Sequence, residues 1–293
     1  MKRERSYPSK VLLLGEYTVL LGSNALAVPF HTFHGNWCDR PMQDTMKSLM
    51  LEWVVYLREK VKAFPVEFDI DDLEKELEDG LGFCSNIPVG YGLGSSGAIT
   101  AAVWDRYGRD LSDMDQLLKV LSTMESFFHG KSSGLDPLVS LSNRPVLTGR
   151  KTTYPKQECW DAFGLKKHLF LWNSGEERRT SALVKRFTED LQDPVYHLAV
   201  TRDLIPQNDN AINALLVNDT ATFDKAWRRI SELQIELFRN MIPGPVRKRW
   251  ETGLEKGHYF FKLCGAGGGG FFLVYAPQTF PEDVKDQKEL MPL

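Results

Sequence analysis

The sequence predicts an α+β protein made of two domains. The chain has 293 residues, which corresponds to about two domains of ordinary size. Short apolar runs that end at glycine, a pattern typical of strands, occur in both halves of the chain. Segments with helical periodicity also occur in both halves, and they do not alternate strictly with the strands as a β-α-β pattern requires.

In the first half, an apolar run at 10–14 ends at Gly15 and a second at 17–21 ends at Gly22, so both predict strands. A third strand is expected around Val146. Apolar residues at helical spacing and a capping box predict three helices: 43–62, 98–107, and one that opens at 112–115 and ends at Gly130.

The second half is mostly helical, and we place the domain boundary near residue 182. A strand at 169–172 precedes this boundary. Helices are expected at 181–191, 197–217 with a break near Pro206, 220–240 and 245–256, and two strands, 259–264 and 271–275, flank a glycine run.

Composition excludes several classes of function. The net charge of −3, with 42% hydrophobic and 26% charged residues, is ordinary for a globular protein and does not indicate nucleic-acid binding. No apolar run approaches a membrane span and no secretion signal is recognisable, so we expect a cytoplasmic protein. The four cysteines are irregularly spaced, which argues against zinc and predicts free thiols: Cys38, Cys84, Cys159 and Cys264.

The strongest functional signal is the glycine- and serine-rich run from Pro88 to Ala98. Glycine at alternate positions removes Cβ atoms, so backbone N–H groups can close on an anion. A helix follows directly, and its N-terminus adds a partial positive charge. Either serine could ligate Mg²⁺. The run therefore predicts a phosphate-binding loop with these residues: Pro88, Gly90, Gly92, Leu93, Gly94, Ser95, Ser96 and Gly97.

Two better-known nucleotide motifs are almost matched, and both are rejected. The segment 125–132 resembles a Walker A loop, but it has Glu125 at the first glycine position and follows a helix instead of a strand. The run 265–270 satisfies G-x-G-x-x-G, but a strand follows it where a dinucleotide site needs a helix. A glycine-rich connection between strands, which allows close approach of backbone or ligand, fits better.

Three charged residues are candidates for chemistry, although each also has an ordinary structural explanation. Glu125 falls within the apolar arc of its predicted helix, so it either extends to solvent from the edge or lies in a cleft. Asp136 precedes a proline in a tight loop, where aspartate is a common turn residue. Lys10 opens an apolar strand.

Taken together, these segments resemble the GHMP kinases. Residues 8–17 are similar to the first motif of that superfamily, residues 88–98 to its Pro-x-x-x-Gly-Leu-Gly-Ser-Ser-Ala loop, and residues 262–270 to its C-terminal glycine motif. The resemblance implies a ribosomal-S5-like N-terminal domain, 1–182, that binds ATP and substrate. It also implies a ferredoxin-like C-terminal domain, 183–293, whose glycine-rich loop includes Gly267 and Gly268 as nucleotide-binding residues.

Within the superfamily the sequence is most similar to mevalonate kinases, through the stretches 125–136 and 173–180. That likeness implies phosphorylation of mevalonate with ATP and Mg²⁺, with Asp136 as the base and Lys10 assisting it. Ser96 and Glu125 would hold the metal. The acceptor would be lined by Glu16, Tyr17, Ser133, Arg178 and Thr180.

The sequence departs from the family pattern at the expected acceptor site, where Tyr17 replaces a histidine and Ile99 replaces an aromatic residue. Gly97 and Cys264 replace the usual alanine and threonine of the other two motifs. The alternatives are a phosphomevalonate kinase or a sugar kinase, a diphosphomevalonate decarboxylase, and a non-catalytic relative. The expected partner is a small molecule, not nucleic acid or a membrane, and a homodimer is one assembly that the family allows.

Overall fold

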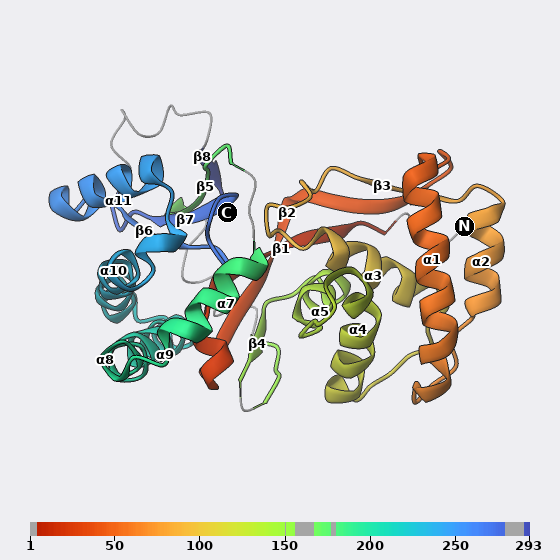
Figure 1. Cartoon of the computed structure of the whole chain (residues 1–293), viewed down its shortest axis with the longest axis horizontal. Helices are drawn as coiled ribbons and strands as arrows, with labels where there is room; N and C mark the ends of the chain where they lie inside the picture. The colour runs from red at the N-terminus through yellow and green to blue at the C-terminus, as the bar shows by residue number, and fades with distance from the viewer. Residues whose placement is uncertain (1–4, 150, 156–166, 177–179, 279–289) are drawn as a thin grey trace. The chain divides into compact units, whose positions relative to one another are not determined.

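The computed structural model describes residues 5–149, 151–155, 167–176, 180–278 and 290–293. The chain forms two compact units (Figure 1). The first comprises Met1–Val11, Ala27–Val89 and Leu93–Val146, and the second comprises Leu12–Leu26, Gly90–Gly92 and Leu147–Leu293. The described residues between 147 and 182 thus pack with the C-terminal part of the chain. The division of functional roles near residue 182 stays a prediction.

The first unit combines a sheet with a group of helices. The strands lie in the order β1 (Tyr7–Leu14), β2 (Ala25–Cys38) and β3 (Gly82–Ser85), and β4 (Val146–Thr148) also pairs with β2. The helices are α1 (Asp44–Lys60), η2 (Val61–Ala63), α2 (Ile70–Glu78), α3 (Ser95–Tyr107), α4 (Met114–His129) and α5 (Leu135–Ser142). Trp53 of α1 is fully buried, and its indole N–H donates to the carbonyl of Met124 on α4 at 3.0 Å.

The second unit is built on an antiparallel sheet whose strand order is β6-β7-β5-β8. The strands are β5 (Leu169–Asn173), β6 (Phe260–Leu263), β7 (Phe271–Tyr275) and β8 (Leu290–Pro292), and every residue of β7 is buried. The helical segments are η1 (Thr18–Leu21), α7 (Thr180–Asp190), α8 (Pro194–Leu198), η4 (Ala199–Leu204), α9 (Ile205–Leu216), α10 (Thr220–Leu237), η5 (Arg239–Met241) and α11 (Gly244–Lys256).

Most predicted elements are confirmed within a few residues at their ends, and the strand expected at 17–21 is wrong. The apolar run at 17–21 forms a 3₁₀ turn instead of a strand, because Tyr17 has φ 61° and the left-handed Gly22 closes the turn. The helix predicted from a capping box at 112–115 is capped by Asp113, whose carboxylate accepts from the N–H groups of Asp115 and Gln116.

The break expected near Pro206 takes the form of a π-helical segment, η4, which joins α8 to α9. Proline has no N–H to donate to the preceding turn, so the hydrogen-bond pattern must change just before it. A π turn accommodates that change without ending the helix.

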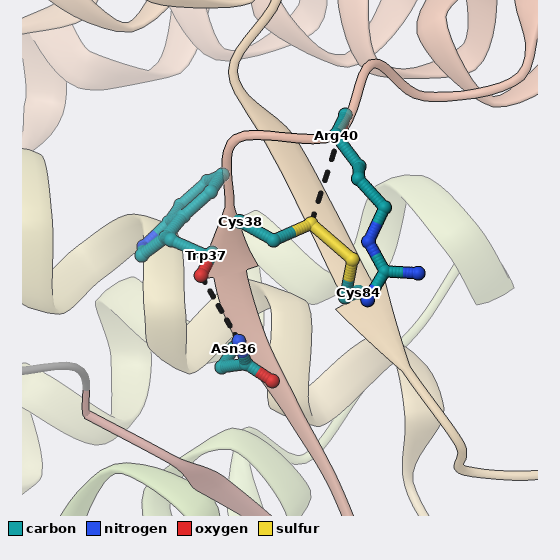
Figure 2. The surroundings of a disulfide bond; sticks show 5 residues. All are labelled: Asn36, Trp37, Cys38, Arg40 and Cys84. Carbon is teal, nitrogen blue, oxygen red and sulfur yellow. Dashed lines mark hydrogen bonds between the residues drawn. A yellow bond between two sulfur atoms is a disulfide. The ribbon is translucent and has the colours of Figure 1, made fainter.

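The prediction that the cysteines are free thiols is wrong for one pair. Cys38 on β2 and Cys84 on β3 form a disulfide, with Cα atoms 6.0 Å apart (Figure 2). The antiparallel register places Asn36 opposite Cys84 and Cys38 opposite Gly82, so the two sulfur atoms meet diagonally on one face of the strand pair. Cys264 is a buried free thiol, and Cys159 lies outside the described residues.

In the described part of the chain, no helix has the length and apolar character that crossing a membrane requires.

Candidate active site

The predicted phosphate loop adopts a backbone that depends on its glycines. Gly90, Gly92 and Gly94 have φ values of 83°, 78° and 75°, a region that favours glycine. A hydrogen bond to β1 fixes the loop: the N–H of Lys10 donates to the carbonyl of the fully buried Leu93 at 2.8 Å.

Helix α3 begins immediately after this loop. Gly94 is its left-handed N-cap residue, and the first intrahelical hydrogen bond runs from Ala98 N–H to Gly94 carbonyl at 3.0 Å. The N–H groups of residues 95–97 precede that bond, so the helix itself gives them no acceptor. This end of α3 can therefore bind an anion.

Lys10 and Asp136 meet beside the loop. The Lys10 ammonium lies 2.7 Å from an Asp136 carboxylate oxygen, and the two side chains are 10% and 27% exposed. Asp136 was expected in a turn but lies in the first turn of α5, after the left-handed Gly134. A proline at position 137 is compatible with this because the first turn of a helix needs no backbone donor.

Two glycines allow α3 and its loop to approach Asp136 closely. A Cβ atom added at Gly97 would lie 2.8 Å from both the Cβ and the carbonyl carbon of Asp136. A Cβ added at Gly94 would lie 3.2 Å from an Asp136 carboxylate oxygen and 3.6 Å from Cβ of Lys10. The carboxylate thus lies directly against the predicted phosphate-binding backbone.

Glu125 on α4 is the second carboxylate of this region, and it is 4% exposed. It accepts a hydrogen bond from the Ser96 hydroxyl at 2.9 Å and another from the Ser132 hydroxyl. Burial raises the pKa of Glu125 to about 7, and the charge of Asp136 contributes to the rise. The hydroxyls of Ser132 and Ser96 and the charge of Lys10 act in the opposite direction.

These oxygen groups suit Mg²⁺ as it is bound in kinases. Within the described ranges there is no group of three or more histidine, cysteine and acidic side chains that could form a complete metal cage. Mg²⁺ in phosphoryl-transfer sites usually takes only one or two carboxylates, with substrate phosphates and water completing its coordination. A buried carboxylate with a serine hydroxyl 2.9 Å away at the start of α3 fits that pattern.

Sequence reasoning missed two residues at this position. Ser132 joins Glu125 to the start of α5, because its hydroxyl donates to Glu125 and accepts from Gly134 N–H at 2.9 Å. His129 lies one helical turn after Glu125, and its Nε2 is 2.8 Å from the Ser96 hydroxyl. The four-residue spacing of Glu125 and His129 on one helix face was the available signal.

The residues predicted to line the acceptor belong to both units, so their grouping around an acceptor stays a prediction. Ser133 is exposed just before α5 and accepts from the N–H of Leu135 at 3.3 Å. The Glu16 carboxylate pairs with Lys262, and the Tyr17 hydroxyl donates to the Ala266 carbonyl, all within the second unit. Arg178 lies outside the described residues, and Thr180 is the first residue of α7.

The predicted nucleotide-binding glycines Gly267 and Gly268 have φ values of 72° and 77°. Gly268 N–H donates to the carbonyl of Met241 at 2.6 Å, so this part of the loop is fixed on η5. A Cβ atom at Gly267 would lie 2.6 Å from the same carbonyl oxygen. The absence of side chains here therefore allows a close backbone approach within the second unit.

The chain has the fold of the GHMP kinases, and the curated proteins that it resembles are kinases of a small molecule. The family profile "GHMP kinases N terminal domain" matches residues 50–144, a range that includes the loop, Glu125 and Asp136.

Within that fold, several of the proteins most similar in sequence are mevalonate kinases. That of Pyrococcus furiosus is 29% identical over 326 aligned residues, covering 94% of this chain and 90% of the relative. That of Archaeoglobus fulgidus is 25% identical, covering 90% of this chain and 89% of the relative. The crystal structure of L. major mevalonate kinase in complex with R-mevalonate superposes with a TM-score of 0.65 at 17% identity, covering 95% of this chain and 88% of that one.

Proposed function

We propose that the chain transfers the γ-phosphoryl group of ATP to the primary hydroxyl of mevalonate, giving 5-phosphomevalonate. The observation that carries the proposal is the Lys10–Asp136 ion pair, 2.7 Å long, which lies against Gly94 of the phosphate loop. An acidic residue beside a phosphate site is what phosphorylation of an alcohol requires. The names of the relatives favour mevalonate as the acceptor.

In this proposal Asp136 is the base of the reaction. An alcohol is a poor nucleophile at neutral pH, and Asp136 accepts its proton as the oxygen attacks the γ-phosphorus. Lys10, held at 2.7 Å from Asp136, stabilises the negative charge that develops on the attacking oxygen. The bond from the γ-phosphorus to the bridging oxygen of ADP breaks as the new ester bond forms.

The remaining groups bind and orient ATP. Gly90, Gly92 and Gly94 let the loop backbone surround the phosphates, and the start of α3 supplies further N–H groups. Ser96 and Glu125 would hold Mg²⁺, which neutralises charge on the β- and γ-phosphates when it is bound. We assign these roles to the domain 1–182, and we assign to the domain 183–293 the glycine-rich loop with Gly267 and Gly268.

Mevalonate also carries a carboxylate, which needs a cationic partner. We assign that partner to Arg178, since a guanidinium binds a carboxylate through two parallel hydrogen bonds. Ser133 and Thr180 would complete the acceptor site. A cytoplasmic location and a homodimer remain expectations, to be tested by cell fractionation and by sedimentation.

A substrate panel tests the proposal. ATP consumption is measured with mevalonate, phosphomevalonate, diphosphomevalonate, homoserine and galactose, and CO₂ release is monitored to detect a decarboxylase. We expect turnover with mevalonate and no CO₂. A strong preference for a phosphorylated acceptor or a hexose would reject mevalonate while leaving the kinase chemistry in place, and absence of any turnover would reject the catalytic assignment.

One variant tests the acceptor site independently of the panel. Arg178→Lys keeps the positive charge but cannot make the bidentate pair of hydrogen bonds with a carboxylate. It should therefore raise KM for mevalonate strongly with little change in KM for ATP. An unchanged KM for mevalonate would show that Arg178 does not bind the carboxylate.

A further inference from the structure

Tyr17 has an unusual backbone and a well-defined side chain. Its φ of 61° lies in the left-handed region, which costs energy for a residue other than glycine and persists only where neighbouring contacts require it. The residue is 6% exposed, and its ring packs on Phe187 and Phe238, with ring centroids 4.8 and 5.1 Å away. The hydroxyl donates to the Ala266 carbonyl, in the glycine-rich loop, at 2.6 Å.

The preceding residue makes a second connection to the same loop. Glu16 and Lys262 form an ion pair 2.5 Å long, and both side chains are 1% exposed. The Lys262 ammonium also donates to the carbonyl of Leu263, the last residue of β6 before the loop. Burial lowers the pKa of Lys262, and the charge and hydrogen bond of Glu16 oppose that change.

A buried ion pair is weak evidence for stability. The cost of removing two charges from water often equals or exceeds their attraction, so apolar replacements of similar volume can be as stable. What such a pair does supply is one fixed geometry. Here that geometry aligns the chain at residues 16–17 with the end of β6.

The loop that follows β6 needs such support. Gly265, Gly267, Gly268, Gly269 and Gly270 all have positive φ values, between 67° and 136°. Glycine is the residue with the greatest backbone freedom, so a run of glycines has little conformational preference of its own. Hydrogen bonds from Gly268 N–H to Met241 and from Gly270 N–H to Glu176 fix the second half of the loop. Tyr17 holds the first half through Ala266, and Lys262 holds the end of β6 that leads into the loop.

We infer that Glu16, Tyr17 and Lys262 form a positioning group that sets the conformation of the loop 265–270 for phosphoryl transfer. All three belong to the second unit, together with the loop. They act through the loop and not by contact with the acceptor. The inference rests on the catalytic role proposed for that loop, and it assigns to Tyr17 a function different from that of the histidine usual at this position.

Tyr17→Phe removes only the hydroxyl and keeps the packed ring. Loss of one hydrogen bond of ordinary strength predicts a fall in kcat of about three- to tenfold, with KM for mevalonate nearly unchanged. Tyr259→Phe is the matched control, because Tyr259 is also 6% exposed and its hydroxyl also donates to a backbone carbonyl, that of Arg249. The control should lose a similar amount of Tm and keep its kcat.

Amide hydrogen exchange gives a readout independent of turnover. In Tyr17→Phe, exchange of the peptide covering residues 264–272 should be faster than in the wild type and in Tyr259→Phe. An increase in acceptor KM without a change in kcat would instead show that Tyr17 lines the acceptor site. Unchanged kcat together with unchanged exchange would also overturn the inference.

The ion pair is tested with two single variants and their combination. Glu16→Gln and Lys262→Met each leave one buried charge without its partner and should lower Tm, whereas the double variant should recover most of that loss. For a positioning group, kcat of the double variant stays low although Tm is restored. Recovery of wild-type kcat in the double variant would show that the pair is only structural. Wild-type turnover in the substrate panel separates these outcomes from failure of the proposed function.

Discussion

Replacing Glu125 with glutamine should stabilise the metal-free protein at alkaline pH although it removes a residue of the active site. The pKa of this carboxyl is about 7 in the folded protein, against an ordinary value of 4.5, chiefly because it is buried. The folded protein therefore binds the proton more tightly than the unfolded chain does. Between pH 4.5 and 7 the free energy of unfolding falls as the pH rises, and above pH 7 the full cost is present.

The size of the effect follows from the two pKa values. The gap between 4.5 and about 7 corresponds to about 3 kcal/mol in the free energy of unfolding at pH 8. Glutamine has a similar shape and no charge to desolvate, so Glu125→Gln should recover up to about 3 kcal/mol there and almost nothing at pH 4.5. The same change removes the carboxylate proposed to hold Mg²⁺, so the Mg²⁺ concentration needed for half-maximal activity should rise.

Thermal unfolding without metal, measured between pH 4.5 and pH 8.5, checks the stability part of this prediction. Glu52→Gln, the same substitution at an exposed position of α1, controls for the loss of one negative charge. Added Mg²⁺ and ATP should stabilise the wild type more than the variant. A Tm for Glu125→Gln that is lower than wild type at pH 8, or a difference that does not depend on pH, would refute the reasoning.

Three further predictions follow from the same geometry. Asp136→Asn should lower kcat by ~10²–10⁴ while the Kd for ATP, measured by calorimetry, stays nearly the same; an unchanged kcat would exclude it as the base. Gly97→Ala, which introduces the family's usual residue, should lower kcat by up to ~10²-fold, because the new methyl displaces Asp136; full activity would contradict this. Reduction of Cys38–Cys84, or their joint replacement by serine, should lower Tm, since a crosslink across 46 residues is worth up to ~4 kcal/mol; identical melting with and without reductant would count against it.

The residues of the candidate site were easier to select from the sequence than the elements that hold them. The glycines and serines of the loop at 88–97 predict an anion site by their type and order alone, because backbone N–H groups would do the binding. Asp136 and Lys10 are 126 positions apart in the sequence. Without the family likeness, Asp136 could be read as a turn residue and Lys10 as the first residue of a strand. Only the family likeness brought them together before the structure showed the 2.7 Å contact.

The disulfide shows why other features could not be predicted. Its pairing depends on the register of β2 with β3, and neither strand was predicted. β2 carries several polar residues along its 14 positions, and β3 has only four residues. Without that register, cysteines 46 positions apart give no sign of meeting. The helical environment of Asp136 was missed for a similar reason, since Gly134 and Pro137 are as typical of a turn as of a first helical turn.

Gly97 and Asp136 are better understood as one feature than as two. Measured against the family pattern, Gly97 is a departure with no evident purpose. In the structure it permits α5 to approach α3 so closely that no Cβ atom fits between them, and this approach places the Asp136 carboxylate beside Gly94. Tyr17 also departs from the family pattern, and its hydroxyl donates a hydrogen bond to the Ala266 carbonyl in the loop 265–270. At both positions the residue that departs from the family pattern lies where two segments approach each other closely: α3 and α5 at Gly97, and the chain at Tyr17 and the loop 265–270.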